Sequence, residues 1–146
     1  MGFTGITVDS IVGDDVTGVQ SMFPRFTFDA DSTPTLAQIQ SYAEKFISAV
    51  GRQVTFKGYD PATLVGGDDL MFVRNWIELK VAAEIHIALD QFKDNPVANA
   101  RLKQLEAVNR DFAECEDPFP TVGRASRSNT VDIFPQRLVR VRSSEL

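Results

Sequence analysis

Cysteine and histidine are almost missing from this sequence. Among its 146 residues there is one cysteine, Cys115, and one histidine, His86. A single cysteine cannot form an internal disulfide, so the fold does not depend on oxidation and can form in a reducing cytosol. A zinc site usually needs three or four Cys and His ligands. The sequence therefore predicts no metal site, and nothing in it indicates a cofactor.

Long hydrophobic runs are missing as well. The N-terminal stretch MGFTGITVDSIVGDD has neither the basic segment nor the continuous apolar stretch of an export signal. Apolar runs elsewhere are broken by charged residues well before they reach a membrane-spanning length. We therefore expect a soluble protein that is made inside the cell and has no membrane partner.

Positive charge is scarce except near the C-terminus. Residues 1–118 carry 18 acidic and 10 basic side chains, a balance of −8, whereas residues 119–146 carry 5 basic and 2 acidic side chains, a balance of +3. An acidic body repels phosphates, which argues against a protein that coats DNA. The basic tail can contact phosphate or an acidic protein surface, or it can simply be solvated.

Candidate catalytic residues are few. His86 lies among Ile85, Ile87 and Leu89, a setting typical of a buried structural histidine rather than a catalytic base. Cys115 has acidic neighbours on both sides, which make it a poor nucleophile, and we expect it to be a small core residue.

One glycine-rich stretch, Val65-Gly66-Gly67-Asp68-Asp69, invites comparison with a phosphate-binding loop. It has no following Lys and Ser/Thr, and two aspartates stand where phosphate would bind. We expect Asp68 or Asp69 to cap a helix instead. With no catalytic constellation in view, the sequence predicts a protein that is not an enzyme.

The strongest secondary-structure signal is a long helix over residues 68–92. Its apolar residues form two stripes at helical spacing, and a helix that is apolar on two faces lies between partners. The first stripe is Phe72, Trp76, Leu79 and Ala83, and the second is Ile77, Val81, Ile85, Ala88 and Leu89. Two pairs of opposite charge, Arg74 with Glu78 and Lys80 with Glu84, suit the strips that face solvent.

Two further helices flank it in the sequence. One begins at Thr33 with Pro34 or at Thr35 with Gln38, continues to Val50, and is expected to end at Gly51. The other begins with Asn95 and Pro96 and closes before Pro118. Its single apolar face consists of Leu102, Leu105, Val108, Phe112 and Cys115.

The sequence thus predicts a mainly α fold, a small helical bundle around one long central helix, with extended N- and C-terminal arms. Residues 1–31 are expected to form the N-terminal arm, with a small hairpin around Gly13 to Asp15, because glycines interrupt short β-branched runs there. Residues 32–118 form the helical core, and residues 119–146 form the C-terminal arm.

The C-terminal arm is expected to be partly β. A linker rich in Pro, Gly and Ser is followed by TVDIFPQRLVRVR, whose alternation suits an edge strand. A strand without an obvious partner in its own chain is a candidate for pairing with another subunit. The predicted partner-binding residues are Arg137, Leu138, Val139, Arg140, Val141 and Arg142.

The order of these features resembles that of a known family. F-T-F-D-x-x-S-T-P-T opens a helix that ends in Ala49-Val50-Gly51, and a glycine-rich connection, a long apolar helix, a helix that ends near Asp117-Pro118 and a Gly-Arg tail follow. Over roughly residues 24–125 this resembles the head-tail connector proteins of tailed phages, also called adaptor or head-completion proteins.

The resemblance implies a structural virion protein of the phage neck, made in the host cytoplasm. Such proteins form a ring, generally of twelve copies, beneath the portal protein, and they join head to tail by extending the DNA channel. The implied partners are further copies of the chain, the portal protein, a downstream stopper or tail-terminator protein, and DNA that passes without sequence-specific binding. An acidic wall suits such a channel because DNA slides along it.

Three other functions stay open from the sequence. The first is a tail-completion or other neck protein, and the second is a small helical regulator that binds DNA. The regulator lacks a basic recognition helix, because residues 101–114 mix Arg101, Lys103 and Arg110 with acidic residues. The third is a small enzyme, for which His86 is the main candidate residue.

Overall fold

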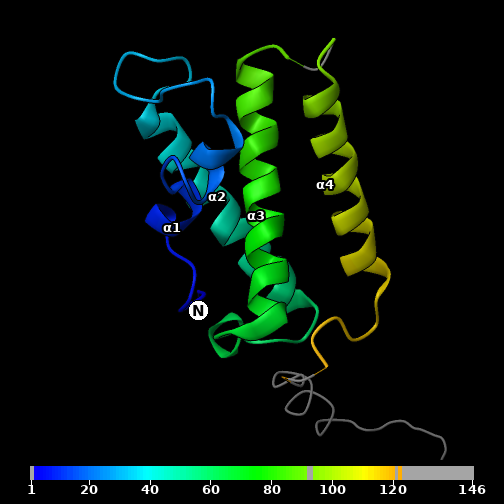
Figure 1. Ribbon diagram of the computed structural model, residues 1–146. Coiled ribbons are helices and arrows are strands. Elements are labelled where there is room, and N and C mark those ends of the chain that lie inside the picture. Colours follow the sequence, from blue (N-terminus) through cyan, green and yellow to red (C-terminus); the bar gives the residue numbers. More distant parts are fainter. Residues whose placement is uncertain (1, 92–93, 121, 123–146) are drawn as a thin grey trace, which may run out of the picture.

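The protein is mainly helical in a computed structural model that describes residues 2–91, 94–120 and 122 (Figure 1). This confirms the predicted fold class. Four α-helices and two short 3-10 helices follow one another, and the described residues contain no β-strand. The elements are α1 (Val8–Val12), η1 (Val19–Met22), α2 (Leu36–Phe56), η2 (Pro61–Thr63), α3 (Gly67–Ala88) and α4 (Pro96–Glu114).

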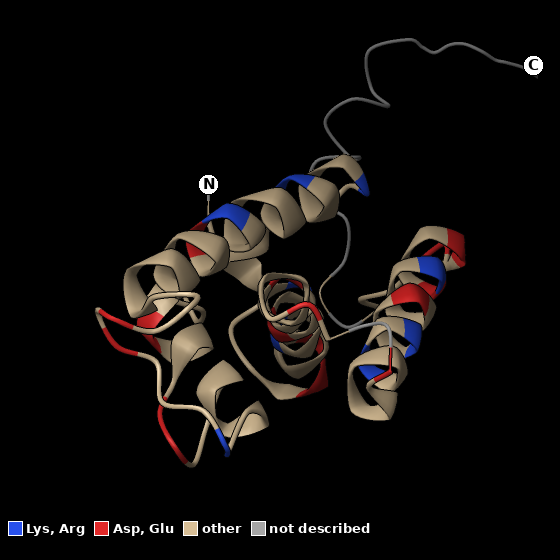
Figure 2. Cartoon of the chain, turned by 90° about the horizontal axis from the view of Figure 1, so that it is seen from above, with Lys and Arg blue, Asp and Glu red and all other residues tan. Residues whose placement is uncertain are grey.

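Helix α3 lies at the centre, as its two apolar stripes predicted. Seen from above, α2 and α4 lie on different sides of it, and the N-terminal elements complete the enclosure (Figure 2). The buried residues of α3 point in several directions: Val73, Trp76, Ile77, Leu79, Val81, Ala82, Ile85 and His86. The predicted central position of this helix is therefore confirmed.

Both ends of α3 differ from the sequence prediction. Gly66 occupies the N-cap position, and Asp68 and Asp69 lie in the first turn, where their charge favours the helix dipole rather than capping the helix. The helix ends at Ala88 instead of reaching residue 92. Asp90 adopts a positive φ of 53°, a left-handed conformation that stops a helix.

Helix α2 begins at the second of its two proposed starts. Thr35 is the N-cap, and a capping box joins its side chain and backbone to Gln38. The predicted end at Gly51 is wrong, since the helix runs on to Phe56 and the chain turns at Gly58, whose φ is +102°. The buried stripe continues from Val50 to Val54.

Helix α4 has the predicted start, because the side chain of Asn95 accepts hydrogen bonds from the backbone N–H groups of Val97 and Ala98. The prediction that Cys115 is a core residue is wrong, because Cys115 follows the last turn and is exposed. The core position is filled from further along the chain by Phe119. Its fully buried ring lies 5.1 Å from that of Tyr59 and 6.0 Å from that of Phe112.

The N-terminal segment also differs from the expected extended arm with a hairpin. Residues 8–12 form α1, with a capping box between Thr7 and Ser10, and a compact loop joins it to η1. Gly13 and Gly18 meet in this loop at positive φ, where an added Cβ would clash with backbone atoms at 2.0 and 2.7 Å respectively. The segment contributes six residues to the core, Ile6, Ile11, Val12, Val19, Phe23 and Phe28.

Candidate functional site

The predicted partner-binding residues, Arg137 to Arg142, lie outside the described residues, so their role stays a prediction. The described part of the chain offers three places where polar chemistry or a binding surface could reside. They are a buried histidine at one end of α3, a partly exposed ion pair on α3 that contacts α1, and a groove between α2 and the N-terminal segment.

His86 is buried, as its apolar neighbours predicted, with 2% of its surface exposed. Its Nδ1 lies 2.7 Å from Gln91 Oε1, and its Nε2 lies 3.1 Å from Arg101 Nη1. Because the Gln91 oxygen accepts and the guanidinium donates, the ring carries one proton, on Nδ1, and is neutral. Burial lowers the pKa of His86; the hydrogen bond to Gln91 opposes this, and the charge of Arg101 adds to it.

Arg101 links three segments around this histidine. Its Nη2 donates to the carbonyl oxygen of Met22 at 2.6 Å, and its guanidinium lies 5.0 Å from the centre of the Phe23 ring. A cavity of about 530 Å³ opens beside it, and its lining includes Arg25 and Asn95. Arg101 thus ties α4 to η1 and α3, which is a structural role, and sequence periodicity had given no sign of it.

Stability should fall as the pH is lowered from 7.5 to 5.5. The unfolded chain takes up a proton on His86 near pH 6.5, whereas the folded chain does so only at a lower pH. The free energy of unfolding is therefore expected to drop with a slope of at most about 1.4 kcal/mol per pH unit. Urea titrations at several pH values measure this slope.

A variant without the histidine separates the contribution of His86 to the pH dependence of stability from that of Glu78, which acts in the opposite direction. Burial raises the pKa of Glu78, although its hydrogen bond to Arg74 and the charge of Arg74 oppose the rise, so this carboxyl adds stability as the pH falls. His86→Gln removes the sole histidine and should flatten the decline. An equally steep decline in His86→Gln would contradict the assignment.

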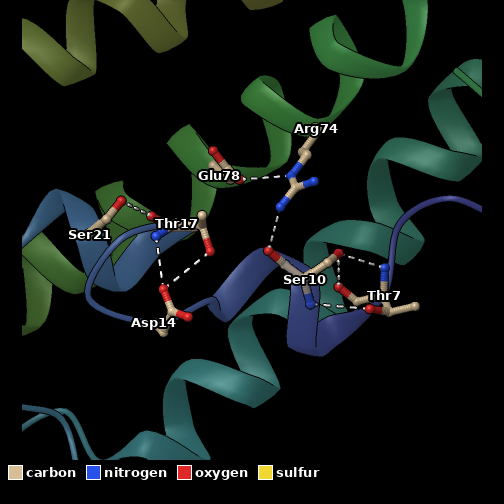
Figure 3. Close-up of polar contacts among 8 residues, drawn as sticks. Thr7, Ser10, Asp14, Thr17, Ser21, Arg74 and Glu78 are labelled. Carbon is tan, nitrogen blue, oxygen red and sulfur yellow. Dashed lines mark hydrogen bonds and ion pairs between the residues drawn. The ribbon is translucent and has the colours of Figure 1, made fainter. Parts of the chain in front are cut away.

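A second polar cluster joins α1 to α3 (Figure 3). Arg74 Nε donates to Glu78 Oε2 at 3.2 Å, and its Nη2 donates to the carbonyl oxygen of Ser10 at 2.9 Å. The predicted pair of Arg74 and Glu78 is confirmed, and its arginine also binds the carbonyl of Ser10, the middle residue of α1. Lys80 behaves differently from its predicted pairing, since its Nζ lies 5.7 Å from the ring centres of both Phe46 and Trp76.

Two contacts within the chain hold the end of α4, one to a backbone carbonyl and one to the carboxylate of Asp117. Lys57 Nζ donates to the carbonyl oxygen of Ala113 at 2.8 Å and supplies the positive charge that a helix C-terminus favours. The hydroxyl of Tyr59 donates to Asp117. These contacts fasten α4 and the residues after it to the end of α2.

A groove of about 660 Å³ lies between α2 and the N-terminal segment. Its floor is a stripe of α2 residues, and its wall is the N-terminal segment. The floor and wall together consist of Gly2, Ile6, Thr7, Val8, Glu44, Ile47, Ser48, Gly51, Arg52 and Thr55. Hydroxyl, apolar and charged groups alternate there, which suits a peptide segment better than a small molecule.

Several large apolar side chains are exposed elsewhere. Phe56, Val65 and Met71 are 80%, 71% and 69% exposed, and they lie where α2 ends and α3 begins. Acidic residues gather instead on the connections that precede α2, including Asp14, Asp15, Asp29 and Asp31 (Figure 2). Exposed apolar side chains therefore gather where α2 ends and α3 begins, beside the exposed Asp68, and other acidic side chains lie on the loops before α2.

The described residues contain no candidate metal site and no candidate membrane-spanning helix. No group of three or more His, Cys, Asp or Glu side chains is placed there to hold a metal ion. No helix among them has the length and apolar content needed to cross a membrane.

Comparisons with protein-family models, curated proteins and solved structures find no match to this chain.

Proposed function

We propose that this protein is a structural component of the neck of a tailed phage. In this proposal, copies of the chain form a ring beneath the portal, join head to tail and extend the DNA channel. The observation that carries the proposal is the order of features along the chain, from the helix capped at Thr35 to the Gly-Arg tail, which resembles that of head-tail connectors.

The described residues have features that suit a protein that assembles with other subunits. Polar side chains drawn toward the interior, such as Arg74 and Arg101, bind backbone carbonyl groups of other elements and hold the fold together. Exposed apolar side chains such as Phe56 and Met71 suit contacts with other subunits. The acidic loops suit a channel that lets DNA pass without adhesion.

A DNA-binding regulator is supported less well. Helix α4 is the best basic candidate, yet Arg101 is occupied by His86 and by the Met22 carbonyl. The guanidinium of Arg110 lies 3.8 Å from the carboxylate of Asp111 on the exposed side of the helix. A recognition helix needs free basic and polar side chains on one face.

Light scattering of the full chain, alone and mixed with the portal protein of the same genome, tests the proposal. We expect a large closed oligomer or co-elution with the portal. A monomer that ignores the portal would overturn the connector assignment and favour a tail-completion or other neck protein. Salt-dependent binding to duplex DNA would favour the regulator instead.

Deletion of residues 130–146 is expected to abolish joining of heads to tails and co-elution with the portal. The reason is that the deletion removes the predicted partner-binding residues Arg137 to Arg142, whereas the described core ends before it. Helical circular dichroism should be retained. The full-length variant with Arg137, Arg140 and Arg142 changed to Gln separates the charge contribution, and unimpaired joining after the deletion would contradict the assigned role.

A further inference from the structure

The cavity beside Arg101 combines apolar and polar side chains in its lining. It lies between η1 with the residues that follow it and the segment that joins α3 to α4. Its volume of about 530 Å³ is within the range of sites that hold small molecules. The polar side chains of the described lining are Arg25, His86, Gln91, Asn95 and Arg101.

The acceptor atoms of these polar side chains are already used within the protein. Asn95 Oδ1 accepts hydrogen bonds from two backbone N–H groups in the first turn of α4. Gln91 Oε1 accepts from His86 Nδ1, and His86 Nε2 accepts from Arg101. Each of the two amides is therefore left with its –NH₂ group, which can only donate. A ligand that satisfies these side chains must supply acceptors.

The two arginines also have donors to spare. Arg101 uses two of its five N–H groups for contacts within the protein, so three have no acceptor in the part of the chain that the structure describes. Arg25 is exposed and forms no ion pair with any described residue. The described lining contains no acidic side chain, and the carboxylates next to it in sequence, Asp90 and Asp94, are exposed. The described lining therefore carries positive charge without a counter-charge.

The half-buried guanidinium of Arg101 favours a carboxylate as the counter-charge. Burial lowers the pKa of Arg101, because a cation loses hydration when it leaves water. A charge-assisted hydrogen bond to an anion offsets this cost, and the guanidinium fork matches the two oxygens of a carboxylate. A carboxylate carries a single negative charge, so it loses less hydration in a half-buried site than a phosphate group of about −1.5 to −2.

The apolar part of the lining suits a planar, apolar body attached to that carboxylate. The rings of Phe23 and Phe26 lie 6.4 Å apart at an angle of 71°, an edge-to-face arrangement to which another flat ring can add. Phe26 is 42% exposed and Val97 is 54% exposed, although both are large apolar side chains. A bound apolar group would remove part of this surface from water.

We propose that this cavity binds a small carboxylic acid with a planar, apolar body. Arg101 binds the carboxylate, Arg25 attracts it from an exposed position, and Phe26 and Val97 cover the body. Arg101 lies in the cavity rather than on an open face of α4, so a small acid can reach it whereas a DNA duplex cannot. This binding does not depend on the proposed phage function.

An NMR titration of the full chain with 2-naphthoate tests the site, because the chain supplies two single-residue reporters. His86 is the sole histidine and lines the cavity, whereas Trp76 is the sole tryptophan and lies outside the described lining. We expect the imidazole signals of His86 to shift and to saturate with a Kd on the order of 0.1 mM. The indole N–H signal of Trp76 should stay in place. Absence of a saturable shift at His86 would overturn the proposal.

Two related probes test the chemistry of the ligand. Uncharged 2-naphthamide has the same body and should bind about tenfold more weakly, because it lacks the charge-assisted hydrogen bonds. Equal affinity for the acid and the amide would overturn recognition of the carboxylate. Tighter binding of 2-naphthyl phosphate than of 2-naphthoate would overturn the choice of a carboxylate over a phosphate.

Variants at exposed arginines locate the site without disturbing the core. Arg25→Gln should weaken binding of 2-naphthoate about fivefold, the effect of losing one partly exposed charge contact. Arg52→Gln removes the same charge from an exposed position on α2 outside the cavity lining and should leave the Kd unchanged. Equal effects of the two substitutions would overturn the assigned site. Arg101→Lys keeps the charge but loses the fork, and we expect about tenfold weaker binding with helical circular dichroism retained.

Discussion

Replacing Trp76 with alanine is expected to lower the free energy of unfolding by about 3–5 kcal/mol, the largest effect of any single truncation that we consider. The indole is 1% exposed and lies between α3 and α4, with its ring centre 4.7 Å from that of Phe112. Its Nε1 also donates to Asn109 Oδ1 at 2.6 Å. Truncation leaves a cavity at the contact that holds α4. Urea denaturation followed by circular dichroism measures the loss.

Two controls separate packing from other contributions at this site. Asn109→Ala removes only the hydrogen-bond acceptor and should cost about 0.5–1.5 kcal/mol. Phe56→Ala removes an aromatic ring that is 80% exposed and should change stability by less than about 0.5 kcal/mol. If Trp76→Ala were no more destabilising than Phe56→Ala, the packing of α4 on α3 would be wrong.

Ile11→Ala is expected to cost about 2–5 kcal/mol, because Ile11 is fully buried in the core that α1 shares with α2 and α3. The same measurement on Val16→Ala provides a nearby control. Val16 is 82% exposed on the loop after α1, so its truncation should have an effect below about 0.5 kcal/mol. An extended arm detached from the core would instead make both substitutions nearly neutral.

The three long helices could be predicted because each repeats its apolar spacing over several turns and two of them carry clear start signals. Thr35 with Gln38 and Asn95 with Pro96 act in the structure as the sequence predicted. Helix α1 could not be predicted, because its five residues are too few for the helical spacing of Val8, Ile11 and Val12 to repeat. The sequence predicts a hairpin around Gly13 to Asp15, whereas in the structure Gly13 meets Gly18 in a compact loop.

Ends of helices were the least predictable part of the fold. Gly51 has the sequence signature of a helix stop, yet it lies on a buried face where Phe3 approaches. Cys115 has the right spacing for the face of α4, yet Phe119 returns from beyond the helix and fills the core. In both places a distant segment decides the outcome, and local spacing carries no information about it.

The candidate site could be predicted only in part. The burial of His86 followed from its apolar neighbours, but its partners Gln91 and Arg101 did not, since Arg101 comes from a different helix. The groove on α2 depends on where residues 2–8 return against the helix, a packing relation that periodicity cannot reveal.

The hydrogen bond from Arg101 to the Met22 carbonyl joins residues that are 79 positions apart. During synthesis the chain emerges from its N-terminus, so η1 leaves the ribosome long before α4 exists. Helices α2 and α3 are sequence neighbours and can pair early, whereas the N-terminal segment completes its contacts only after residue 101 has emerged. Until then Phe23, whose ring lies against Arg101 in the finished fold, lacks this contact, and transiently exposed apolar surface of this kind favours aggregation.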